Sequence, residues 1–173
     1  MDEFGIPGVT PARAHVVRDF AASELFDRTF QEGMELVEET AAYLDGAGRQ
    51  ESKLLPRSVA LSYAGESMRL TTRLMQVASW LLVQRAVREG SMAPMEACES
   101  RYRLNPEASA TPVEIAGLPE GIVELGRRAE RLYDRVAHLD RRMYLNAADA
   151  AAPHPVLSQF DRLRTEFPGL MAS

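Results

Sequence analysis

The chain has 173 residues, of which 46% are hydrophobic and 26% are charged, as in one globular domain with a sizeable core. The net charge of -5 and the isoelectric point near 5.3 give no general attraction to nucleic acid or anionic lipid. The single cysteine, Cys98, cannot form an internal disulfide, and no apolar run is long enough to span a membrane. The first residues also lack a secretory signal, so we expect a cytoplasmic protein.

Residues 1–22 contain two prolines and two glycines, and we expect a mobile N-terminal segment there, in which the amphipathic stretch Ala12 to Phe20 could instead pack as a brief helix. The first long helix is predicted over 23–45, with Ser23 as its N-cap. A glycine inside a helix indicates close approach by another helix, and Gly33 lies on the apolar stripe. That stripe consists of Phe26, Phe30, Gly33, Met34, Val37, Ala41 and Leu44.

The second predicted helix, 56–89, is the longest uninterrupted one, beginning at Pro56 and ending before Gly90. It carries two apolar seams at helical spacing. The first seam is Leu61, Ala64, Met68, Thr71, Met75, Ala78, Leu82 and Ala86. The second seam is Tyr63, Leu70, Leu74, Val77 and Leu81. Two seams indicate neighbours on two sides: either the helix is central to a bundle, or one seam contacts a second subunit.

The remaining face of this helix places Trp80, the only tryptophan, beside arginine and glutamine. One interpretation is that the ring covers a loop or a helix end while its N–H stays in water. The other is a protein-contact site, because Trp and Arg often dominate interfaces.

A short helix is predicted over 93–102, and the proline-rich segment 105–119 is either a crossover or a functional loop. The third long helix, 120–145, has a regular seam of Ile122, Leu125, Ala129, Leu132, Val136, Leu139 and Met143. Its arginines alternate with acidic residues, which favours ion pairs with the acidic first helix over phosphate binding.

Residues 147–173 are expected to form a flexible tail that begins with a low-complexity hinge. If the tail becomes helical, one face carries Val156, Leu157, Phe160, Leu163 and Phe167. This face either docks on the bundle as a fourth, short helix or binds in the groove of a partner protein.

No constellation of reactive side chains is evident in the sequence. His15, His138 and His154 are scattered, and none has an acid or a second histidine at metal-ligand spacing. Phosphate-binding loops, dinucleotide fingerprints and nucleophile elbows do not occur. We therefore expect a non-enzymatic protein that acts by binding and has no catalytic residue, metal or cofactor.

Two stretches, FDRTFQEGMELVEETAAYLDG (26–46) and YAGESMRLTTRLMQVASWLLVQRAVREG (63–90), resemble the family of RcdA, the regulator of CtrA degradation in alphaproteobacteria. The resemblance implies an all-α fold, an antiparallel three-helix bundle over 23–146 that forms a homodimer. It also implies a non-enzymatic adaptor for the ClpXP protease primed by CpdR. Further implied partners are the adaptor PopA and cargo transcription regulators such as CtrA, with recruitment to the cell pole.

From the seams and the exposed pattern we predict two groups of contact residues. The dimer interface is expected at Tyr63, Leu70, Leu74, Val77 and Leu81. Partner binding is expected at Arg69, Arg73, Trp80, Phe160 and Leu163. The alternative functions are a structural scaffold dimer in cell-cycle or division complexes without a role in proteolysis, and a DNA-associated regulator.

Overall fold

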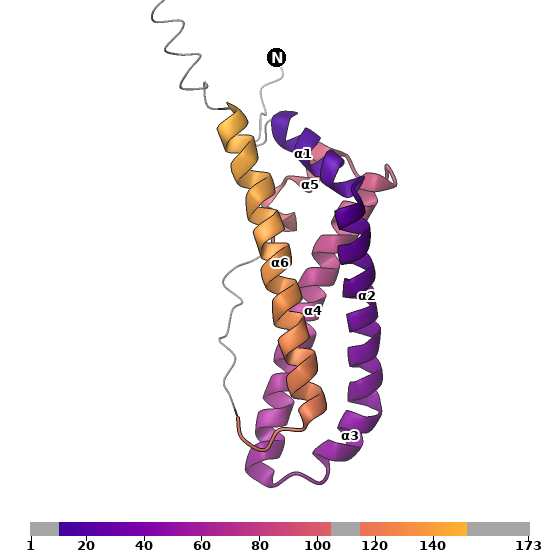
Figure 1. Ribbon diagram of the computed structural model, residues 1–173, viewed down its shortest axis with the longest axis vertical. Helices are drawn as coiled ribbons and strands as arrows, with labels where there is room; N and C mark the ends of the chain where they lie inside the picture. The colour runs from indigo at the N-terminus through magenta and orange to yellow at the C-terminus, as the bar shows by residue number, and fades with distance from the viewer. Residues whose placement is uncertain (1–10, 105–114, 152–173) are drawn as a thin grey trace, which may run out of the picture.

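The computed structural model describes residues 11–104 and 115–151, with side chains as far as Met143. Three long helices lie side by side along the molecule (Figure 1): α2 (Glu24–Asp45), α4 (Arg57–Arg88) and α6 (Glu120–Ala151). The expected all-α fold and the three long helices are confirmed. Among the described residues there is no strand.

The three long helices do not simply alternate in direction along the chain. α2 is antiparallel to both other long helices, but α4 and α6 run parallel to each other (Figure 1). Arg69 of α4 pairs with Glu130, and Trp80 lies beside Asp140, so the two helices advance together. The chain therefore returns between α4 and α6 to the end of the bundle at which α4 begins, and residues 105–114 of this connection lie outside the described part of the chain.

The core is centred where the three long helices meet at Gly33 of α2. A methyl group on Gly33 would lie 2.6 Å from Leu81 Cδ1 of α4 and 3.8 Å from Leu132 Cδ2 of α6. Leu81 and Leu132 are both 0% exposed. The close approach expected at Gly33 is therefore confirmed, and the predicted seam of α6 is buried apart from the half-buried Leu139.

Ion pairs connect the outer sides of α2 and α6, as the charge pattern predicted. Arg128 pairs with Glu39 at 2.7 Å, and Arg135 pairs with Glu32 at 2.6 Å. These side chains are about half exposed, and each such pair contributes about 0.2–1 kcal/mol. The pairs fix which sides of the two helices face each other more than they stabilise the fold.

The N-terminal segment corrects one expectation. Residues 11–21 form a helix, α1 (Pro11–Ala21), which packs across α4, α5 and α6 and buries Val17 and Ala21. The prediction of a mobile segment over 1–22 is thus wrong for 11–21, because these apolar side chains close one end of the bundle. Residues 1–10 lie outside the described part of the chain.

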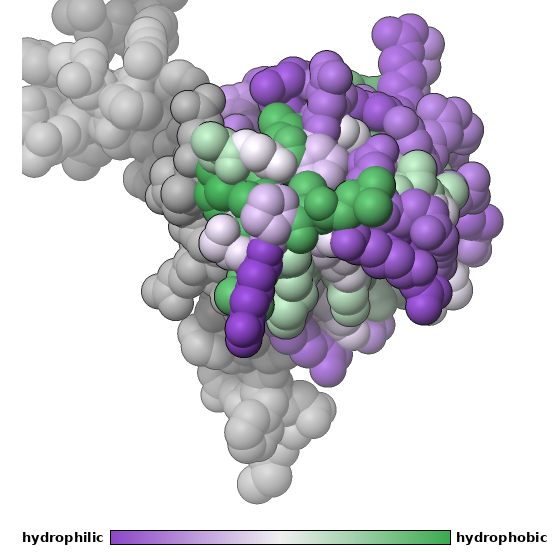
Figure 2. Space-filling model, turned by 90° about the horizontal axis from the view of Figure 1, so that it is seen from below, coloured by the Kyte–Doolittle hydropathy of each residue, from purple (hydrophilic) through white to green (hydrophobic). Residues whose placement is uncertain are grey.

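The connections contain short helical turns. The linker after α2 forms α3 (Ala47–Ser52), and the predicted helix 93–102 divides into α5 (Pro94–Ala97) and a 3₁₀ turn, η1 (Ser100–Tyr102). Seen from below, apolar side chains gather at the end where α3 joins α4 (Figure 2), and Leu54 in that turn is 87% exposed. α6 continues to Ala151, so residues 147–151, which were expected in the tail, are helical; residues 152–173 lie outside the described part of the chain.

Replacing Gly33 with leucine tests the three-helix contact. We expect Gly33→Leu to lower the free energy of unfolding by about 2 kcal/mol or more, because a larger side chain must displace Leu81 in a packed core. Ala41→Leu, at an exposed position on the same helix, is the control for the larger side chain. Urea unfolding of both variants measures the difference, and equal stabilities would contradict the contact.

Candidate interaction surface

One face of α4 is exposed and uncharged along almost the whole helix. Between Arg57 and Arg85, none of its exposed residues, all within the described part of the chain, carries a charge. By contrast, the exposed sides of α2 and α6 are rich in Glu and Arg. We call this surface the α4 face and define it as Ser58, Leu61, Ala64, Gly65, Met68, Thr71, Thr72, Met75, Ser79 and Leu82.

Large apolar side chains recur on the α4 face every seven residues. Leu61 is 70% exposed, Met68 73%, Met75 64% and Leu82 51%. They span 21 residues, or roughly 32 Å of helix. A row of large exposed apolar side chains along one helix face is typical of a protein-contact site.

Gly65 gives independent support for a neighbour on the α4 face. A glycine in the middle of a helix costs about 1 kcal/mol relative to alanine. No atom of the chain lies within 4 Å of the position of a Cβ at Gly65, so packing within the chain does not require glycine there. Close approach by a second helix would require it.

The predicted dimer residues lie elsewhere. Tyr63, Leu70, Leu74, Val77 and Leu81 are between 0% and 8% exposed and pack in the core of the single chain. The prediction that this seam forms a dimer interface is therefore wrong, because α2 and α6 already cover it. The exposed face corresponds to the first seam, in which large apolar residues recur every seven positions. The prediction of a dimer interface at the second seam left the first seam to the bundle.

The arginines predicted to bind a partner belong to a network between α4 and α6. Arg73 is 3% exposed; its Nε lies 3.1 Å from Glu130 Oε1, and its guanidinium stacks 4.0 Å from the centre of the Tyr133 ring. Arg69 pairs with Glu66 at 2.9 Å and also with Glu130. Arg73 is thus unavailable to a partner, and Arg69 is largely engaged within the chain.

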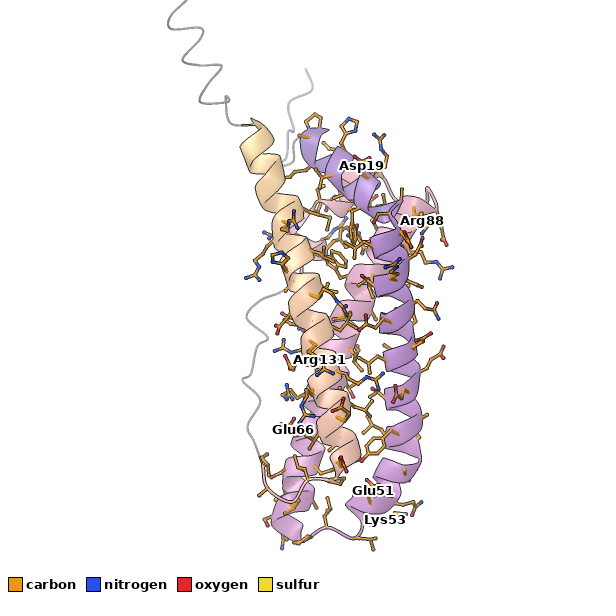
Figure 3. All side chains as sticks on the ribbon, in the orientation of Figure 1. Asp19, Glu51, Lys53, Glu66, Arg88 and Arg131 are labelled. Atoms are coloured by element: carbon orange, nitrogen blue, oxygen red, sulfur yellow. The ribbon has the colours of Figure 1, made fainter. Side chains whose placement is uncertain are left out.

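Beside this network, a groove of about 620 Å³ runs between α4 and α6. Glu66 of α4 and Arg131 of α6 line it, and both lie on the side of the bundle away from α2 (Figure 3). Ile122 and Gly126 also line it. Its charged residues include both signs in equal number, so it favours no particular charge on a ligand.

Trp80 is also buried, at 3% exposed, so the expectation of an indole N–H in water is wrong, while its ring packs on Phe20 near the end of α1. Its indole Nε1 donates a hydrogen bond of 3.0 Å to Oδ1 of Asp140, which is itself 3% exposed. Arg103 contacts the other carboxylate oxygen at 3.4 Å, and the Leu104 N–H also donates to Asp140. Asp140 therefore fixes the end of the connection after η1 against α4 and α6.

Phe160 and Leu163, the other predicted contact residues, lie outside the described residues. Over the described part of the chain, no group of three or more His, Cys, Asp or Glu side chains is placed to hold a metal ion. In the same part, no helix combines the length and apolar character that crossing a membrane requires. The most distinctive surface is the α4 face.

Asp140 makes a pH-dependent contribution to stability. Burial raises the pKa of Asp140 above its ordinary value of 3.8, so its carboxyl binds a proton more tightly in the folded state. This contribution is present below the unfolded pKa and is lost as the pH rises through the folded pKa. The expected result is that Asp140→Asn becomes more stable relative to the unsubstituted chain as the pH rises above 3.8, the ordinary pKa of the group.

Thermal unfolding across this pH range tests the effect. Asp134→Asn, at an exposed position on the same helix, is the control for loss of a carboxyl group. If Asp140→Asn instead loses stability relative to the unsubstituted chain as the pH rises, the ion pair with Arg103 affects Asp140 more than burial does.

Comparison with known proteins places this arrangement in a family. The model of the family described as "Protein of unknown function (DUF1465)" matches residues 17–167. The crystal structure of RcdA from Caulobacter crescentus CB15 is 68% identical in sequence, with a TM-score of 0.62. The match covers 74% of this chain and 98% of that chain, which confirms the resemblance to RcdA. No curated protein matches the chain. The chain belongs to the DUF1465 family.

Proposed function

We propose that this chain is a non-enzymatic adaptor that binds cargo and delivers it to the ClpXP protease. The observation that carries the proposal is the 68% identity to RcdA over 98% of that chain. In the scheme that the resemblance implies, CpdR primes the protease, PopA is a further partner, and the cargo is a cell-cycle transcription regulator such as CtrA. The adaptor acts in the cytoplasm and is recruited to the cell pole.

The described surface suits this role. An adaptor needs faces that hold other proteins, and the α4 face offers about 32 Å of uncharged helix beside strongly charged neighbours. Charged residues are depleted in the centres of protein interfaces, as they are on this face. The α4 face therefore replaces the buried seam as the proposed interface.

The occupant that we propose for the α4 face is a second copy of the chain. An interface between two identical copies must complement itself, and an uncharged face avoids like-charge repulsion. Its apolar residues are also symmetric about the point between Thr71 and Thr72. When two copies of α4 lie antiparallel about that point, Leu61 meets Leu82 of the other copy and Met68 meets Met75.

Degradation of CtrA in a mixture of ClpXP, CpdR and PopA tests the adaptor role. We expect the full chain to accelerate degradation about tenfold or more, because tethering raises the local cargo concentration to the millimolar range. A chain ending at Ala151 should still fold, because α6 is complete, but should lose delivery of at least part of the cargo.

Two controls separate the possibilities. Omitting CpdR should abolish the acceleration if the protease must be primed. Degradation at the same rate with and without the full chain would contradict the adaptor role and leave the scaffold dimer as the alternative. Equal delivery by the full chain and the shortened chain would exclude only the tail from the mechanism.

A further inference from the structure

A second groove lies beside the α4 face, between α4 and the segment Arg101–Leu104. It encloses about 420 Å³ and extends along α4 from Thr72 to Val83. Its lining includes the apolar residues Trp80, Val83, Tyr102 and Leu104, together with Met75 and Ser79 of the α4 face. The groove is long enough for three turns of helix, since 11 residues rise by roughly 16 Å.

The polar groups of this groove define the chemistry of a ligand. The side-chain Oε1 of Gln76 is buried and has no hydrogen-bond partner among the described residues, so it can accept a hydrogen bond from a ligand. Arg101 and Arg103 lie at the rim with side chains 62% and 39% exposed, and within the chain they pair with Glu99 and Asp140. A fitting ligand presents apolar side chains to the floor and a carboxylate to the rim.

The groove is preformed because its outer wall is fixed to α6. Asp140 accepts hydrogen bonds from Trp80 in the floor and from the Leu104 N–H in the wall, and it pairs with Arg103. The wall is thereby held by a side chain that is itself buried. A ligand that enters the groove does not have to order this wall, which lowers the entropic cost of binding.

Residues 156–167 of this chain have the matching chemistry. In a helical conformation they present one apolar face, made of Val156, Leu157, Phe160, Leu163 and Phe167. Twelve residues of helix are roughly 18 Å long, close to the length of the groove. Asp161 and Glu166 supply carboxylates for the arginine rim. The DUF1465 match ends at residue 167, so this apolar pattern lies within the sequence typical of the family.

The chain is also long enough to place this segment in the groove. From Asp140, which contacts the groove wall, α6 rises by roughly 16 Å to Ala151. The five residues from Ala151 to Val156 can span up to about 17 Å when extended, which brings the start of the helical segment back to the level of Asp140. Pro153 and Pro155 favour a break after α6, so the chain can turn back along the bundle.

From these observations we propose that residues 156–167 dock in the groove between α4 and Arg101–Leu104 of the same chain. The docked segment covers Phe160 and Leu163, which are also the tail residues proposed to contact a partner. A partner that binds them must first displace the segment, so docking lowers the affinity of the tail for that partner. The docking itself does not depend on the adaptor role.

Limited trypsin digestion of the full chain tests this contact. Trypsin cuts after arginine, and Arg162 and Arg164 lie inside the segment. The reference is a synthetic peptide of residues 152–173, in which both sites are free. A segment docked for about nine-tenths of the time is cut about tenfold more slowly than a free one, and mass spectrometry follows the two cuts.

Three variants locate the contact. Gln76→Arg fills the groove and Phe160→Asp removes an apolar contact, so each should raise the cutting rate to that of the peptide with the same tail sequence. Gln50→Arg, at an exposed position on α3, is the matched control and should keep the protection. Circular dichroism confirms that each variant is folded. The tail substitution does not alter the described bundle, so the test stands even if Gln76→Arg unfolds.

Several results would overturn the proposal. Equal cutting rates in the full chain and the peptide would mean that the segment is not docked. Protection that survives Gln76→Arg or Phe160→Asp would place the segment elsewhere. Protection that rises with protein concentration would assign the groove to the tail of another copy. Each of these results leaves the degradation assay unaffected, so failure here and failure of the adaptor role are distinguishable.

Discussion

The fold depends on the way α4 contacts two helices with one side and leaves its opposite side open. Gly33 lets α2 approach Leu81, and Leu132 of α6 completes the contact. Because α4 then packs against α2 and α6 together, one of its two apolar seams is buried and the other is exposed. The surface that we assign to a second copy is thus a direct consequence of the core.

Buried polar groups set the remaining arrangement on the α4–α6 side. Arg73 and Asp140 are each 3% exposed, and an unpaired charge at such positions would be strongly destabilising. Arg73 is satisfied by Glu130 and Tyr133, and Asp140 by Trp80 and by the segment after η1. These pairs hold α4 and α6 in a parallel register and shape the groove proposed for the tail.

The sequence predicted the three long helices and the seam of α6, because a regular apolar period depends on one helix alone. It did not predict which α4 seam is buried, since both have helical spacing and only the partner helices decide. In α2, Leu36 is 1% exposed although it lies outside the predicted stripe, whereas Ala41 is exposed. The buried side of α2 includes Thr29 and Thr40. Because these residues are polar, a search for recurring hydrophobic residues does not identify this side as the buried one. The contact between Trp80 and Asp140 joins residues 60 positions apart, so no local sequence pattern predicts it.

The mass of the protein in solution tests the central claim most directly. Light scattering at micromolar concentration should give twice the 19.2 kDa of one chain. A variant with Met68→Asp and Met75→Asp should give one folded chain, while Leu25→Asp, at an exposed apolar position on α2, should stay paired. An unsubstituted chain that is monomeric, or a doubly substituted chain that remains paired, would contradict the assignment of the α4 face to a second copy.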